Sequence, residues 1–160
     1  MRKLLVIGLG NPDRGDDAVG AMIARSLAGR LPEGTTVRER AGDMLSLIDD
    51  WSAFDAVICV DAAAPAGNPG RIHRLDAAVD ALEPDFAFAS SHAYGLAEAV
   101  ALARQLGLAP RDLIVYAVEG MSFDAGAPLT APVAAALQPT ADRVVEEAKR
   151  LVRRAEAVHA

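Results

Sequence analysis

The sequence predicts an α/β fold with three layers, in which a mostly parallel β-sheet carries helices on both faces. Three apolar runs are continuous rather than alternating, which is typical of strands buried on both faces; they are Leu4–Ile7, Ala56–Val60 and Leu113–Val118. Stretches with a helical spacing of apolar residues separate these runs. Because a strand, a helix and a further strand form a parallel crossover unit, this alternation indicates a largely parallel sheet.

In the first half of the chain, glycine and proline mark the boundaries between strands and helices. The first helix begins near Asp17, and Gly29 and Pro32 close it. The segment TTVRER alternates, as expected for a strand with one polar face. The expected elements are a strand over 3–9, a helix over 17–30, a strand over 35–40, a short helix over 44–51 and a strand over 56–60.

In the second half, two loops rich in glycine and proline, 64–70 and 119–129, interrupt the pattern. Residues 76–91 carry weak signals, and no element is assigned to them. The last helix is long and amphipathic, and its final turns carry four basic residues that complement the helix dipole. The expected elements are an edge strand over 71–75, a helix over 94–106, a strand over 113–118 and a helix over 131–155.

Composition limits the classes of function. The 160 residues predict one domain over 1–160, and 52% hydrophobic with 24% charged residues fits a globular protein. The net charge of −6 argues against a nucleic-acid partner. A single cysteine excludes an internal disulfide and a cysteine-based zinc cluster. No signal peptide or membrane-spanning stretch is evident, so we expect a cytoplasmic protein without a membrane partner.

The most informative stretch is GLGNPDRGDD at 8–17, which joins the first strand to the first helix. Asp16 and Asp17 therefore lie where the carboxyl end of a strand meets a helix start, the usual place for ligands in an open α/β sheet. The unpaired N–H groups of a first helical turn account for one carboxylate as a cap, the role we favour for Asp16. The second carboxylate is then left without a structural role.

A second acid is expected at the same edge of the sheet. If the first strands have the spatial order 2-1-3, the strands ending at Gly8 and Asp61 are neighbours, and a crevice opens outside their carboxyl ends. Asp17 and Asp61 both face it. A carboxylate that ends a buried strand is costly unless it is paired; the alternative is that Asp61 caps the turn at 62–64.

His92 is the third candidate. It lies in SSHAYG at 90–95, just before a predicted helix, whereas His73 and His159 are expected to face solvent. Alone, His92 would more simply donate to a backbone carbonyl. Together with Asp17 and Asp61 it forms a mixed oxygen and nitrogen set that suits a divalent ion such as Ni, Zn, Mn or Fe and leaves positions open for water or substrate.

Other chemistries fit less well. The phosphate loop GK[ST], the zinc motif HExxH and the nucleophile elbow GxSxG are all missing from the sequence. Asp13 stands where a dinucleotide-binding loop needs a small residue. Cys59 lies within a strand and is assigned to the core, and Ser90 and Ser91 are expected to cap a helix.

The motifs resemble those of the hydrogenase maturation protease family, nearly end to end and in the same order. They are GLGNPDRGDDAVG at 8–20, VDA at 60–62, SSHAYGL at 90–96, VEG at 118–120 and PLTAPV at 128–133. The resemblance implies a roughly five-stranded twisted sheet flanked by helices. It also implies an endopeptidase that removes the C-terminal extension of a [NiFe] hydrogenase large-subunit precursor, with nickel recognised by Asp17, Asp61 and His92. The nickel is then supplied by the precursor rather than held tightly at rest.

The reaction implied is hydrolysis of a peptide bond, and two mechanisms remain open. In one, hydrolysis is metal-assisted, with Asp61 or Asp16 as the base; in the other, nickel only positions the tail and the carboxylates transfer protons. Glu119 either borders the crevice or forms a salt bridge with an arginine. Asp43 either shapes the cleft or caps a helix.

Two other functions are consistent with part of the sequence. The segment GLGNP also opens peptidyl-tRNA hydrolases, but those enzymes continue with a tyrosine and then, about ten residues on, a His-Asn pair. The first histidine of this chain is His73, so the pair is missing. A non-catalytic, nickel-sensing maturation chaperone would keep the same three ligands. Which hydrogenase is served depends on the surface loops at 64–70 and 119–129.

Overall fold

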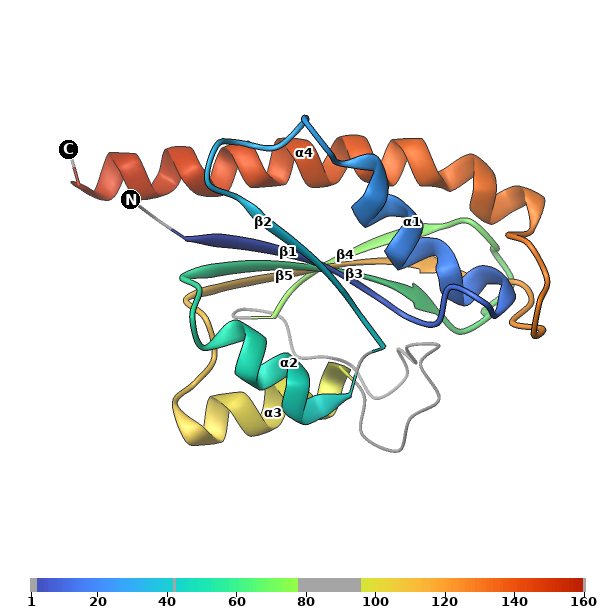
Figure 1. Ribbon diagram of the computed structural model, residues 1–160, viewed down its shortest axis with the longest axis horizontal. Coiled ribbons are helices and arrows are strands. Elements are labelled where there is room, and N and C mark those ends of the chain that lie inside the picture. Colours follow the sequence, from blue (N-terminus) through green and yellow to red (C-terminus); the bar gives the residue numbers. More distant parts are fainter. Residues whose placement is uncertain (1–2, 42, 78–95, 160) are drawn as a thin grey trace.

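The computed structural model describes residues 3–41, 43–77 and 96–159 of the chain. They form a sheet of five strands in the order β2-β1-β3-β5-β4, parallel except for the β4–β5 pair (Figure 1). The predicted α/β class and the 2-1-3 order of the first strands are therefore confirmed. The strands are β1 (Leu4–Leu9), β2 (Thr36–Arg40), β3 (Ala56–Ala63), β4 (Ile72–Asp76) and β5 (Asp112–Glu119).

Helices cover both faces of this sheet, as the sequence predicted. Figure 1 shows α1 and α4 on one face and α2 and α3 on the other. The helices are the 3-10 turn η1 (Gly15–Ala18), α1 (Val19–Ser26), α2 (Met44–Trp51), α3 (Leu96–Leu106) and α4 (Ala131–His159). Within the described residues, no helix is both long and apolar enough to cross a membrane.

Two differences from the predicted bounds affect the carboxyl edge of the sheet. The first helix begins as the η1 turn and ends at Ser26, because the chain turns before Gly29, whose φ is +76°. β3 continues past its apolar run to Ala63, since it pairs with β5 along its whole length. Asp61 consequently lies inside a strand rather than after one.

The core is divided by the sheet into two apolar clusters. Side chains alternate along β1, so Leu4 and Val6 pack under α1 and α4, while Leu5 and Ile7 pack under α2 and α3. Burying one such side chain stabilises the fold by about 1.5–3 kcal/mol. Cys59 is fully buried in the second cluster, which confirms its assignment to the core, and burial raises the pKa of its thiol.

Two glycines let α1 approach the sheet closely. A Cβ at Gly8 would lie 2.3 Å from the carbonyl oxygen of Gly20, and a Cβ at Gly20 would lie 2.3 Å from that of Leu9 and 2.5 Å from that of Val60. No other residue fits at these crossings without a backbone shift. This contact sets η1, immediately before α1, over the carboxyl ends of β1 and β3.

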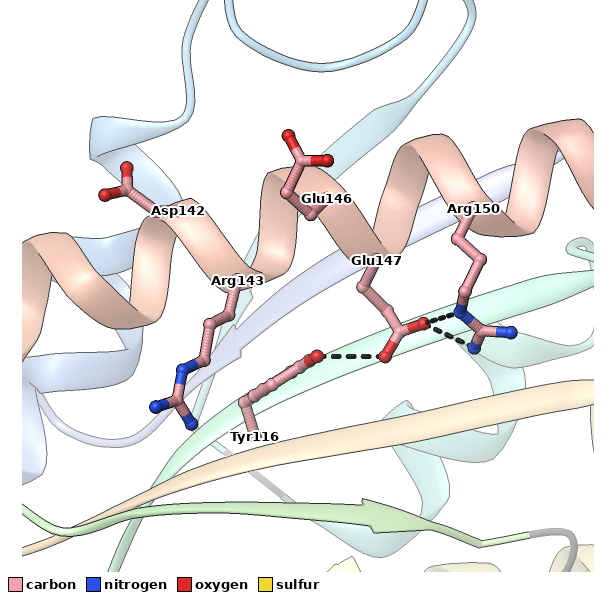
Figure 2. Close-up of a pocket in the computed structure, with 6 residues that line it drawn as sticks. All are labelled: Tyr116, Asp142, Arg143, Glu146, Glu147 and Arg150. Atoms are coloured by element: carbon pink, nitrogen blue, oxygen red, sulfur yellow. Dashed lines mark hydrogen bonds and ion pairs between the residues drawn. The ribbon is translucent and has the colours of Figure 1, made fainter.

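A buried carboxylate joins α4 to the sheet on the same face. Glu147 Oε1 accepts hydrogen bonds from the Tyr116 hydroxyl (2.9 Å) and Arg74 Nε (2.6 Å), and Glu147 Oε2 accepts one from Arg150 Nε (2.6 Å). Figure 2 shows Tyr116 and Arg150 on either side of this carboxylate, in the wall of a surface pocket of about 380 Å³. Burial alone would raise the pKa of Glu147, but these donors outweigh it and leave the pKa below its ordinary value.

We predict that Glu147→Gln destabilises the protein by about 1–3 kcal/mol at pH 7, because the donors lose a charged acceptor. The lowered pKa means that the folded state binds fewer protons than the unfolded state near pH 4, so this stabilisation is lost as the pH falls through the folded pKa. The free energies of unfolding of the wild type and the variant, measured with denaturant from pH 7 to pH 3, should converge below about pH 4.5, the ordinary pKa of a glutamate side chain. A constant difference across that range would contradict a role for the charge.

Candidate functional site

Two of the predicted site residues meet at the carboxyl edge of the sheet. β1 and β3 are neighbours in parallel register, with Gly8 opposite Val60. Asp61 follows Val60 in β3, and Asp17 lies in η1, eight residues after β1 ends. The strand order therefore brings together two acids that are far apart in the sequence.

Asp61 is fully buried, and only one of its two carboxylate oxygens accepts a hydrogen bond from the described residues. Its Oδ1 accepts a hydrogen bond from the Ala62 backbone N–H (2.8 Å), whereas its Oδ2 is buried with no hydrogen-bond partner among the described residues. Burial raises the pKa of this carboxyl to about 8; the Ala62 hydrogen bond opposes the shift, and the charge of Asp17 adds to it. Because β3 continues through Ala63, Asp61 does not cap a turn.

Asp17 has the same division of roles between its two oxygens. Its Oδ2 accepts a hydrogen bond from the Asn11 N–H (2.8 Å), and its Oδ1 is buried without a partner in the part of the chain that the structure describes. Gly10 makes room for this arrangement: its φ is +119°, and a Cβ there would lie 2.9 Å from Asp17 Oδ1. A side chain at position 10 would thus occupy the space beside the open oxygen.

The open oxygens of Asp17 and Asp61 fit a cation. Asp61 is fully buried and Asp17 half-buried, and their neighbouring carboxylates repel each other. Each also has a buried oxygen without a partner among the described residues, so both costs fall when a positive ion binds between them. The described residues contain no cluster of three histidine, cysteine or acidic side chains able to hold a metal ion. The third predicted ligand, His92, lies outside the described residues, together with Ser90 and Ser91.

Asp16 does not act as the predicted helix cap. η1 has no side-chain cap, and the buried Asp16 carboxylate instead accepts four hydrogen bonds from the 121–130 segment. Burial would raise its pKa, but these donors lower it below the ordinary value. With both oxygens engaged by donors and a lowered pKa, Asp16 is poorly suited to accept a proton.

Two further acids fix loops at or near this edge. Glu119 is 2% exposed and accepts a hydrogen bond from the backbone N–H of Asn68, so it holds the 64–70 loop, and it forms no salt bridge with an arginine of the described residues. Asp43 accepts from the Ser46 N–H and caps α2, one of its two predicted roles.

His73 lies on β4 and is partly exposed to solvent. Burial and the charge of Arg71 lower its pKa.

Comparison with known proteins gives one consistent family. A family model described as "Hydrogenase maturation protease" matches residues 34–147. Hydrogenase 2 maturation protease of Escherichia coli K12 is 30% identical over 147 residues, which are 89% of this chain and 88% of the relative.

Solved structures agree with that match. The hydrogenase maturating endopeptidase HybD of E. coli is 28% identical with a TM-score of 0.74, covering 94% of this chain and 93% of its own. A [NiFe] hydrogenase maturation protease HybD from Thermococcus kodakarensis, 24% identical with a TM-score of 0.71, covers 92% of this chain and 99% of its own. The second likeness concerns the fold alone.

We predict that Asp61→Asn stabilises the free protein by about 1–3 kcal/mol at pH 7, because a neutral amide replaces a carboxyl with an uncompensated burial cost. The raised pKa makes the wild type lose stability as the pH rises from about 4 to about 8, so the gain should grow over that range. Thermal unfolding at several pH values measures it.

Asp50→Asn provides the matched control. Asp50 is also buried, but it accepts hydrogen bonds from Arg38 and Arg40, so its substitution should lower the unfolding temperature. Equal destabilisation by Asp61→Asn and Asp50→Asn would show that the buried Asp61 carboxyl does not lower the stability of the free protein.

Proposed function

Because this chain belongs to the hydrogenase maturation protease family, we propose that it removes the C-terminal extension of a [NiFe] hydrogenase large-subunit precursor after nickel has been inserted. The observation that carries this proposal is the pair of open carboxylate oxygens, Asp17 Oδ1 and Asp61 Oδ2. Keeping these two oxygens without a hydrogen-bond partner among the described residues costs stability in the free protein, and a cation bound between them would offset that cost.

The nickel ion belongs to the substrate in this proposal. Asp17 and Asp61 supply one oxygen each, held in place by the Asn11 and Ala62 amides. His92 supplies the nitrogen donor, a role that rests on the motif SSHAYGL. Three protein ligands leave room for groups of the precursor, so an ion already bound to the precursor is recognised without being extracted. The free protein then carries no tightly bound nickel.

Asp61 is the candidate base. A nickel ion supplies Lewis acidity, which favours attack of water on a nearby carbonyl. Hydrolysis also needs a group that accepts a proton from the water and returns it to the leaving amine. Asp61 performs this task only while its open oxygen is not bound to the nickel, which Asp17 and His92 then hold; Asp16 has both oxygens engaged by donors. If nickel only positions the tail, the same residue still performs the proton transfers.

We predict that the wild-type protein shortens a nickel-loaded large-subunit precursor and leaves the nickel-free precursor intact. Asp17→Asn and His92→Ala should slow processing at least about 100-fold, because each removes a ligand that the neighbouring acids cannot replace. The change in precursor mass, followed over time, measures the rate. Glu146→Gln is the control, because this residue is exposed on α4 and pairs with Lys149 only at the surface.

Two outcomes would contradict this account. Processing at the wild-type rate by the Asp17 and His92 variants would show that the site is wrongly assigned. Binding of the nickel-loaded precursor without any shortening would instead identify a non-catalytic maturation chaperone.

A further inference from the structure

The segment 13–16 and the segment 121–130 are joined along their backbones. Gly126 N–H donates to the Asp13 carbonyl (2.7 Å), Gly15 N–H to the Ala127 carbonyl (3.1 Å), and Asp16 N–H to the Ser122 carbonyl (2.9 Å). These segments lie more than 100 positions apart in the sequence, yet they meet immediately before the site residue Asp17. The start of the 121–130 segment therefore has a fixed place beside the site.

The Asp16 side chain lies at the centre of this junction. Its Oδ1 accepts from the Thr130 N–H (2.7 Å), and its Oδ2 accepts from the Met121 N–H (2.8 Å), the Ser122 N–H (3.1 Å) and the Thr130 hydroxyl (2.8 Å). Gly15 permits the close approach, because a Cβ there would lie 2.6 Å from the Ser122 carbonyl oxygen. One carboxylate thus fixes both ends of the 121–130 segment.

The same junction presents an exposed apolar side chain at the carboxyl edge of the sheet. Met121 is held by its backbone N–H, but 57% of its surface is exposed. The preceding residue, Gly120, donates its N–H to the carbonyl of Ala63, two residues after Asp61. Figure 1 shows the chain before α4 and the chain before α1 at the same end of the sheet. Met121 is therefore an exposed side chain on a fixed backbone at the carboxyl edge of the sheet.

We propose that Asp16 is a positioning residue that holds the 121–130 segment as a preformed wall of the substrate site, with Met121 contacting an apolar side chain of the precursor next to the cleaved bond. This inference rests on the proposed function. A segment that is already ordered loses little entropy when substrate binds. A methionine side chain adapts to apolar partners of different shape. The contribution of Asp16 is therefore to substrate engagement rather than to the chemical step.

The test is the kinetics of precursor processing by Asp16→Asn. An amide offers one oxygen where the carboxylate offers two, so it cannot accept from all four donors. We expect KM for the nickel-loaded precursor to rise at least about tenfold while kcat stays within about threefold. Thr130→Val, which removes only the hydroxyl donor, should shift KM in the same direction by less. Asp50→Asn, a buried and multiply hydrogen-bonded acid on another part of the fold, should leave KM unchanged.

Met121→Ser separates positioning from general stability. This variant should raise KM without lowering the unfolding temperature, because the side chain is exposed. In the Asp16→Asn background it should add little further, since the segment is then no longer held in place. A fall in kcat with unchanged KM for Asp16→Asn, or fully additive effects in the double variant, would overturn the proposal.

A binding measurement distinguishes failure of the proposed function from failure of the positioning role. If the wild-type protein does not cleave the precursor, the same comparison is made on the dissociation constant of the nickel-loaded precursor. Weaker binding by Asp16→Asn and Met121→Ser, with Asp50→Asn unchanged, would still support the positioning role. Unchanged binding by both variants would refute it.

Discussion

The organising constraint of this structure is the placement of two carboxylates, the half-buried Asp17 and the fully buried Asp61, at the carboxyl ends of adjacent parallel strands. Each has one oxygen that accepts a hydrogen bond from a backbone amide and one oxygen with no partner within residues 3–41, 43–77 and 96–159. Burial and mutual repulsion both oppose such a pair, so the fold gains nothing from it in the free protein. The close packing of α1 on the sheet at Gly8 and Gly20 nevertheless keeps both acids in place.

The acids at or near this edge differ in how many donors reach them. Asp16 accepts four hydrogen bonds and fixes the 121–130 segment, and Glu119 fixes the 64–70 loop. Asp17 and Asp61 each accept one from the described residues, which leaves them available to bind a ligand. Side chains with the same carboxylate group therefore differ in how many hydrogen bonds they accept, according to the backbone around them.

The strands and the meeting of Asp17 with Asp61 were predictable from the sequence. Continuous apolar runs identify buried strands, and the usual order of such strands makes their carboxyl ends adjacent. The role of Asp16 was not predictable in this way, because its partners lie 105 to 114 positions away and polar contacts at that separation leave no periodic signal. The same holds for the contact between Glu119 and Asn68. The place of His92 stays a prediction from its motif.

The central claim is that Asp17 and Asp61 jointly bind the nickel ion carried by the precursor. X-ray absorption at the nickel edge tests it most directly, on the nickel-loaded precursor alone and after rapid mixing and freezing with this protein. The account predicts that mixing adds oxygen or nitrogen ligands to the nickel, and that Asp17→Asn diminishes the change. Identical nickel spectra with and without the wild-type protein would contradict it.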